Sequence, residues 1–101
     1  MNTLVEKSIR AAEVFTEIEI QESHYQRAYA TLIVLERKLD DKEVRYYRAL
    51  QSQSKASKQS LQFQIYTLDG LRSKFHEYAA MKLQKITLLR LQMAVILQEL
   101  Q

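Results

Sequence analysis

The chain is poor in the residues that end helices and form turns. It has 101 residues, with one glycine and no proline. All-β and α/β domains need many turns, and glycine and proline form most of them. The composition therefore speaks strongly against both fold classes, and the length leaves room for one domain.

Cysteine and tryptophan are also absent. A chain without cysteine has no disulfide framework, no thiolate zinc site and no cysteine nucleophile. The residues that are abundant, such as Leu, Gln, Lys, Glu, Arg and Ala, are those that α-helices tolerate well. We therefore predict an all-α protein.

Acidic residues are scarce in one part of the chain. The formal net charge is +3, and no carboxylate side chain occurs between Val44 and Leu68. This excess is well short of the dense Lys and Arg tracts of a dedicated nucleic-acid-binding protein. It does predict a cationic tip that could meet an anionic membrane or a nucleic acid, and its basic residues are Arg45, Arg48, Lys55 and Lys58.

Long hydrophobic runs are missing as well. The longest mainly apolar run, residues 86–97, contains Arg90 and Gln92. It has about 12 residues, whereas a membrane-spanning helix needs about 20. No apolar stretch follows a basic stretch near the N-terminus, so no secretory signal is evident. We expect a soluble, cytoplasmic protein.

Apolar residues recur at alternating spacings of three and four, which is the heptad pattern of coiled coils. The first seam that this spacing predicts has three acidic members and consists of Ala11, Phe15, Ile18, Glu22, Tyr25, Tyr29, Leu32, Glu36, Leu39, Glu43, Tyr46 and Leu50. The second consists of Leu61, Ile65, Leu68, Arg72, Phe75, Ala79, Lys82, Ile86, Leu89, Met93, Ile96 and Leu100.

The predicted architecture is one helical domain over residues 1–101, a long antiparallel hairpin. A helix over about 3–50 and a helix over about 61–100 are joined by a polar connection at 51–60. Residue i then faces about residue 110 − i, which sets the acidic N-terminal stretch near Lys82, Lys85 and Arg90. The alternative is a three-helix bundle broken at Asp40–Asp41 and Asp69–Gly70. Asp40 with Glu43 matches a capping box, which could start a helix, and Gly70 could end one.

Apolar residues near the termini exceed what one seam can cover. A helix that is apolar on most sides needs partners on several sides. We expect these residues to dock onto other helices, from a second copy or from a different protein, and so to build a larger bundle. A three-helix monomer that covers them itself, or a missing part of a longer chain, are the alternatives. The predicted docking residues are Val5, Ile9, Leu88, Leu91, Val95 and Leu97.

The sequence has no pattern that predicts catalysis. His24 and His76 lack a ligand three or four residues away, so neither predicts a metal site. No glycine-rich phosphate loop or nucleophile elbow is present. We therefore expect no enzyme, no cofactor, no metal and no small-molecule substrate. The predicted function is a protein–protein interaction module, a coiled-coil subunit, scaffold or adaptor, or a chaperone-like protein.

Overall fold

The computed structural model describes residues 3–52 and 55–101 and consists of two long α-helices. Helix α1 spans Thr3–Ser52 and helix α2 spans Lys55–Leu100. The all-α prediction is confirmed, because every described residue except Gln101 is helical.

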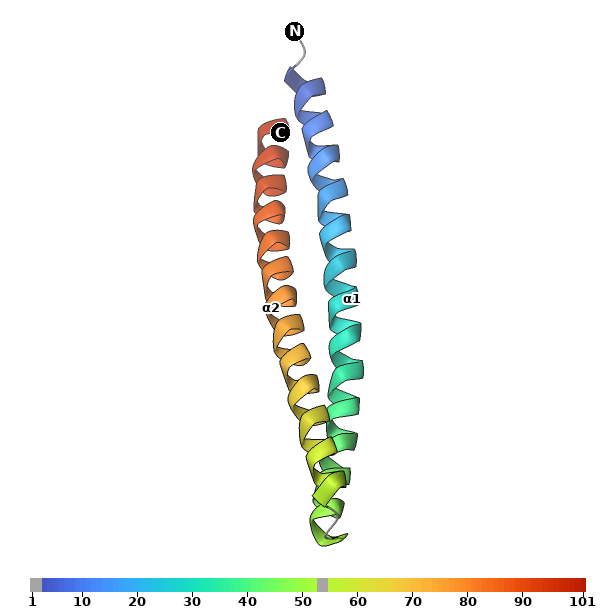
Figure 1. The fold of residues 1–101 in the computed structure, drawn as a ribbon. Helices are drawn as coiled ribbons and strands as arrows, with labels where there is room; N and C mark the ends of the chain where they lie inside the picture. The colour runs from blue at the N-terminus through green and yellow to red at the C-terminus, as the bar shows by residue number, and fades with distance from the viewer. Residues whose placement is uncertain (1–2, 53–54) are drawn as a thin grey trace. The chain divides into compact units, whose positions relative to one another are not determined.

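The chain divides into two compact units. The terminal unit is Met1–Arg27 with Ala79–Gln101, and the connection unit is Ala28–Tyr78. In each unit a part of α1 lies beside an antiparallel part of α2. Figure 1 shows the blue start of α1 next to the red end of α2, and the green end of α1 next to the yellow start of α2. This is the pairing of a helical hairpin.

The three-helix alternative is wrong. Helix α1 continues through Asp40 and Asp41, and α2 continues through Gly70. The side chain of Glu43 is not needed to cap a new helix, because the helix does not restart there. A Cβ atom at Gly70 would meet nothing within 4 Å. The glycine is therefore simply tolerated on an open helix surface, at about 1 kcal/mol relative to alanine.

The connection between the helices is shorter than predicted. The polar segment 51–60 was expected to be non-helical, but residues 51–52 and 55–60 belong to the helices, and residues 53–54 lie outside the described residues. Gln, Lys and Ala favour helices, and the segment has no glycine or proline to end one. Its polarity predicts that the segment is exposed. It does not predict that the helix stops.

The seam of α1 is predicted correctly at every second position only. Ala11, Ile18, Tyr25, Leu32, Leu39 and Tyr46 are buried or half-buried, as expected. At the alternate positions the structure turns the preceding residue further inward, and of the predicted members there Glu22 is half-buried while the others are exposed. The residues that replace Phe15, Glu22, Tyr29, Glu36, Glu43 and Leu50 in the seam are Val14, Gln21, Ala28, Leu35, Lys42 and Ala49.

The seam of α2 is confirmed throughout. All its predicted members, from Leu61 to Leu100, are buried or half-buried. The best-covered apolar side chains of the two units lie in these seams. Ile86 in the terminal unit and Leu39 in the connection unit are each 2% exposed.

Candidate functional site

Ion pairs mark the two flanks of the terminal unit. Arg90 Nη2 on α2 donates a hydrogen bond to Glu22 Oε1 on α1, at 2.9 Å. On the other flank Lys85 Nζ lies 3.8 Å from Glu17 Oε1. Both pairs join the acidic N-terminal stretch to basic residues of α2, as predicted. The pairing rule places position 88 opposite Glu22, close to Arg90, but it places position 93 opposite Glu17, eight residues from Lys85. Because these side chains are well exposed, each pair stabilises the fold by only a few tenths of a kcal/mol.

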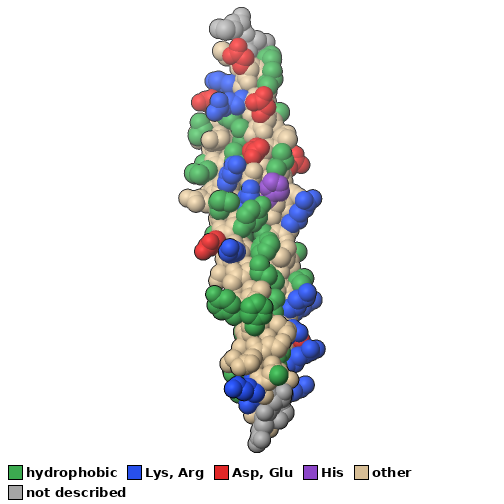
Figure 2. Space-filling view, viewed as in Figure 1, with side chains coloured by type: hydrophobic (Ala, Val, Ile, Leu, Met, Phe, Trp, Pro, Cys, Tyr) green, Lys and Arg blue, Asp and Glu red, His purple; other side chains and the backbone are tan. Residues whose placement is uncertain are grey.

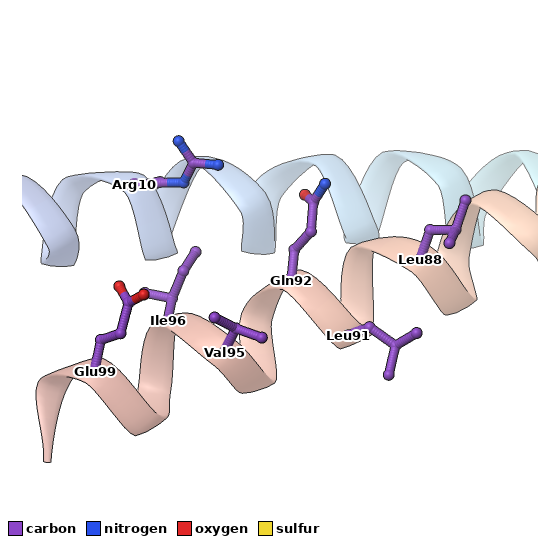
Figure 3. Close-up of a pocket in the computed structure, with 7 residues that line it drawn as sticks. All are labelled: Arg10, Leu88, Leu91, Gln92, Val95, Ile96 and Glu99. Atoms are coloured by element: carbon purple, nitrogen blue, oxygen red, sulfur yellow. The ribbon is translucent and has the colours of Figure 1, made fainter.

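An apolar groove lies on the Glu17–Lys85 flank. It has a volume of about 630 Å³. In Figure 3, Gln92 and Ile96 point towards α1, whereas Leu91 points away from it. Leu88, Leu91 and Val95 are 53–59% exposed, although they are aliphatic. The lining residues are Arg10 on α1 and Leu88, Leu91, Gln92, Val95, Ile96 and Glu99 on α2.

The groove contains half of the predicted docking face. Leu88, Leu91 and Val95 are spaced three and four residues apart, so they lie on one side of α2, nearly opposite its seam. The structure brings these three together in one site. Each of them is an exposed aliphatic residue, as the docking prediction requires.

The other three predicted docking residues lie elsewhere. Leu97 follows Arg90 by one heptad, so it belongs to the Glu22–Arg90 flank and not to the groove. Val5 and Ile9 are exposed on α1 and do not line the groove. The six residues were expected to form one face because all are apolar and near the termini. Their heptad positions, however, separate them around the helices.

One seam residue of the terminal unit is both polar and fully buried. Gln21 is 4% exposed, and its Nε2 donates a hydrogen bond to Glu17 Oε1 at 2.8 Å. Its Oε1 is buried and has no hydrogen-bond partner among the described residues. A buried polar atom without a partner costs about 1–3 kcal/mol. Such a residue in a coiled-coil seam is typical of a position that selects one alignment at the expense of stability.

The predicted cationic tip belongs to the connection unit, and the structure partly neutralises it. Arg45 Nε lies 3.2 Å from Asp41 Oδ2, one turn back along α1. Lys58 is half-buried, whereas Arg48 and Lys55 are exposed. Figure 2 shows mainly Lys and Arg among the charged side chains near this end of the viewed face. The tip therefore presents fewer unpaired charges than the sequence suggests.

Aromatic side chains are exposed near this tip. Tyr47 and Tyr66 line a second groove, in the connection unit, and are 66% and 79% exposed. Phe63 is 70% exposed and was not predicted as part of this surface. The sequence does indicate that Phe63 is exposed, because it lies two residues after the seam residue Leu61 and therefore points to a different side of the helix. Gln62 Nε2 donates a hydrogen bond to Tyr46 Oη at 3.0 Å and joins the two helices there.

Neither histidine lies in a metal site. His76 Nε2 is 3.8 Å from Glu36 Oε1 across the two helices of the connection unit. His24 is half-buried, and its Nδ1 has no hydrogen-bond partner in the part of the chain that is described. Over residues 3–52 and 55–101, no group of three or more His, Cys, Asp and Glu residues is placed to hold a metal ion.

Neither described helix combines the length and the apolar character that crossing a membrane requires. No protein-family model, curated protein or solved structure matches this chain.

Proposed function

We propose that the protein is a non-catalytic interaction module that binds other helices through the groove of the terminal unit. The observation that supports this is the exposure of Leu88, Leu91 and Val95 on one side of α2. Burying an aliphatic side chain of this size contributes about 1.5–3 kcal/mol. Three of them within about two turns of a helix provide the apolar stripe that helix-in-groove recognition uses.

The rim of the groove suits a helical partner. Arg10, Gln92 and Glu99 surround the apolar residues with groups of both charges and one neutral amide. Protein interfaces commonly place an apolar centre inside such a polar rim. An amphipathic helix with charged flanks fits this arrangement better than a small molecule, because the groove is shallow and open on one side.

Binding of an anionic surface by the cationic tip is the weaker candidate. Of its four basic residues, Arg45 is paired and Lys58 is half-buried, whereas Arg48 and Lys55 are exposed and outside the ion pairs of the described residues. Phosphate recognition gains affinity from each unpaired cation that it uses. Two exposed cations, Arg48 and Lys55, therefore provide little affinity for an anionic surface.

Photo-crosslinking of the complete chain tests the proposed function. Benzoylphenylalanine replaces Leu91 in one sample and Val34, an equally aliphatic and 50% exposed residue of the connection unit, in the control. We expect adducts with a helical protein or with a second copy at position 91 only. In a Val95→Glu background these adducts should be lost, because a carboxylate in the groove opposes burial of an apolar partner.

Equal adduct yields at positions 91 and 34 would contradict the proposal, as would adducts at position 91 that survive Val95→Glu. Helix content measured by circular dichroism should be unchanged in every sample, since the substituted side chains lie outside the seam.

A further inference from the structure

The groove residues of α2, together with Lys85 beside them, place a positive and a negative charge at equal distances from one central residue. Gln92 is at its centre, with Lys85 seven residues before it and Glu99 seven residues after it. The aliphatic residues Leu88 and Val95 lie between the centre and the two charges. Positions seven residues apart lie on the same side of a coiled-coil helix, so Lys85, Gln92 and Glu99 share one side of α2.

A pattern of this kind is complementary to itself. In a two-fold symmetric interface, if residue i contacts residue j of the other copy, then j contacts i. An axis at Gln92 that sets two copies of α2 antiparallel brings Lys85 opposite Glu99 of the second copy, and Glu99 opposite its Lys85. The same rotation brings Leu88 to the level of position 96 of the second copy, one residue from its Val95, and leaves Leu91 near the axis.

We propose that the groove binds a second copy of this chain, with the two α2 helices antiparallel about Gln92. This assignment rests on the proposed function and names the partner. The charges that guide it are available, because the side chains of Lys85 and Glu99 are about half exposed, at 53% and 50%. Opposite charges at the two ends of one apolar stripe favour this alignment over a parallel one, which would set Lys85 against Lys85.

The ion pairs within each chain strengthen the match. Lys85 lies 3.8 Å from Glu17, and Glu99 lies 3.8 Å from Lys7. In the dimer these pairs join end to end, so that Glu17, Lys85, Glu99 of the second copy and Lys7 of the second copy alternate in sign. Networks of charges contribute more than isolated exposed pairs do.

Charge exchange tests the alignment. Lys85→Glu and Glu99→Lys are made singly and together in the complete chain, and self-association is measured by sedimentation over a concentration series. Each single variant sets like charges against each other twice per dimer, so we expect its dimerisation to weaken about tenfold. The double variant restores opposite charges between copies and should dimerise more tightly than either single variant, although less tightly than the parent because the row of four charges no longer alternates in sign.

The double variant also separates contacts between copies from contacts within one chain. It places a carboxylate at position 85 beside Glu17 and an ammonium group at position 99 beside Lys7, so both of these contacts within the chain remain unfavourable. Recovery therefore reports the contact between copies. Mixing the two single variants should give a mixed dimer, seen by native mass spectrometry, because their charges then match at both ends.

A parent that stays monomeric at every concentration overturns the proposal, and so does a double variant that associates no better than the single ones. The proposed function fails separately. If position 91 crosslinks to a different protein while the parent is monomeric, the groove is a docking site and the second copy is the wrong partner. If Leu91→Glu with Val95→Glu leaves dimerisation intact, the copies associate elsewhere and the second copy is not the partner of the groove. Val34→Glu with Val44→Glu serves as the matched control.

Discussion

The two units expose apolar residues to a similar degree but in different arrangements. In the terminal unit, Leu88, Leu91 and Val95 repeat on one side of one helix. In the connection unit, the exposed aliphatic residues are spread around both helices, and many of the exposed apolar residues are tyrosines, whose hydroxyl groups keep contact with water. Single exposed apolar residues are ordinary on protein surfaces, whereas a contiguous stripe marks an interaction site. Arrangement, and not amount, distinguishes the two units.

The contacts between the helices differ too. In the terminal unit, the ion pairs Lys7–Glu99, Glu17–Lys85 and Glu22–Arg90 connect α1 to α2. In the connection unit, the described contacts between the helices include the Gln62–Tyr46 hydrogen bond and the His76–Glu36 pair. Substitutions in matched positions can test how far the units behave separately.

The largest effect is expected from emptying a seam position in either unit. Ile86→Ala and Leu39→Ala each remove a side chain that is 2% exposed. Each should lower the free energy of unfolding by about 2–5 kcal/mol, measured by urea denaturation. In hydrogen exchange, Ile86→Ala should accelerate amides of the terminal unit and Leu39→Ala those of the connection unit. Exchange that rises equally along the whole chain in both variants would contradict the division into two units.

A smaller effect, an increase in stability, is expected at Gln21, the fully buried polar residue in the seam of the terminal unit. Gln21→Leu removes a buried amide oxygen that lacks a partner among the described residues and adds apolar contacts, so the free energy of unfolding should rise by about 1 kcal/mol. Thermal and urea denaturation measure it. The control is Gln26→Leu, because Gln26 is exposed on the same helix and its substitution should change stability little. A destabilised Gln21→Leu variant would mean that the amide has a partner in solution.

The smallest effect is expected in the connection unit, at its one glycine. Gly70→Ala adds a Cβ atom in open space within a continuous helix, so stability should rise by about 0.5–1 kcal/mol. Urea denaturation measures the change, which should be the same at all protein concentrations because Gly70 is outside the groove. A loss of stability would show that the helix is bent or interrupted at this residue.

The seam of α2 could be predicted in full because its apolar members keep one phase on both sides of Arg72 and Lys82, whose long side chains can hold their charges in water. In α1, two neighbouring residues compete for each of several seam positions. Phe15, Tyr29 and Leu50 are larger than Val14, Ala28 and Ala49, and hydrophobicity alone favours them as seam residues. That choice, however, places Glu22, Glu36 and Glu43 in the seam as well.

Desolvation of charge decides between the two registers of α1. Burying a carboxylate without a matched partner costs far more than leaving an aromatic ring exposed. The structure accordingly keeps the three glutamates at the flanks, where Glu22 and Glu36 reach partners on α2. A prediction that treats a carboxylate at a seam position as strongly unfavourable, and not as a tolerated break in the heptad pattern, selects the observed seam.

The separation along the chain between paired residues differs sharply between the units, and this has a consequence for the order of folding. The Gln62–Tyr46 bond closes a segment of 16 residues, whereas the Arg90–Glu22 bond closes one of 68. The chain entropy lost on closing the longer segment is greater by about 1.3 kcal/mol. If the two helices first pair beside the connection and pairing then proceeds towards the termini, the long segment is never closed in one step. We therefore expect the groove to be the last part of the hairpin to form.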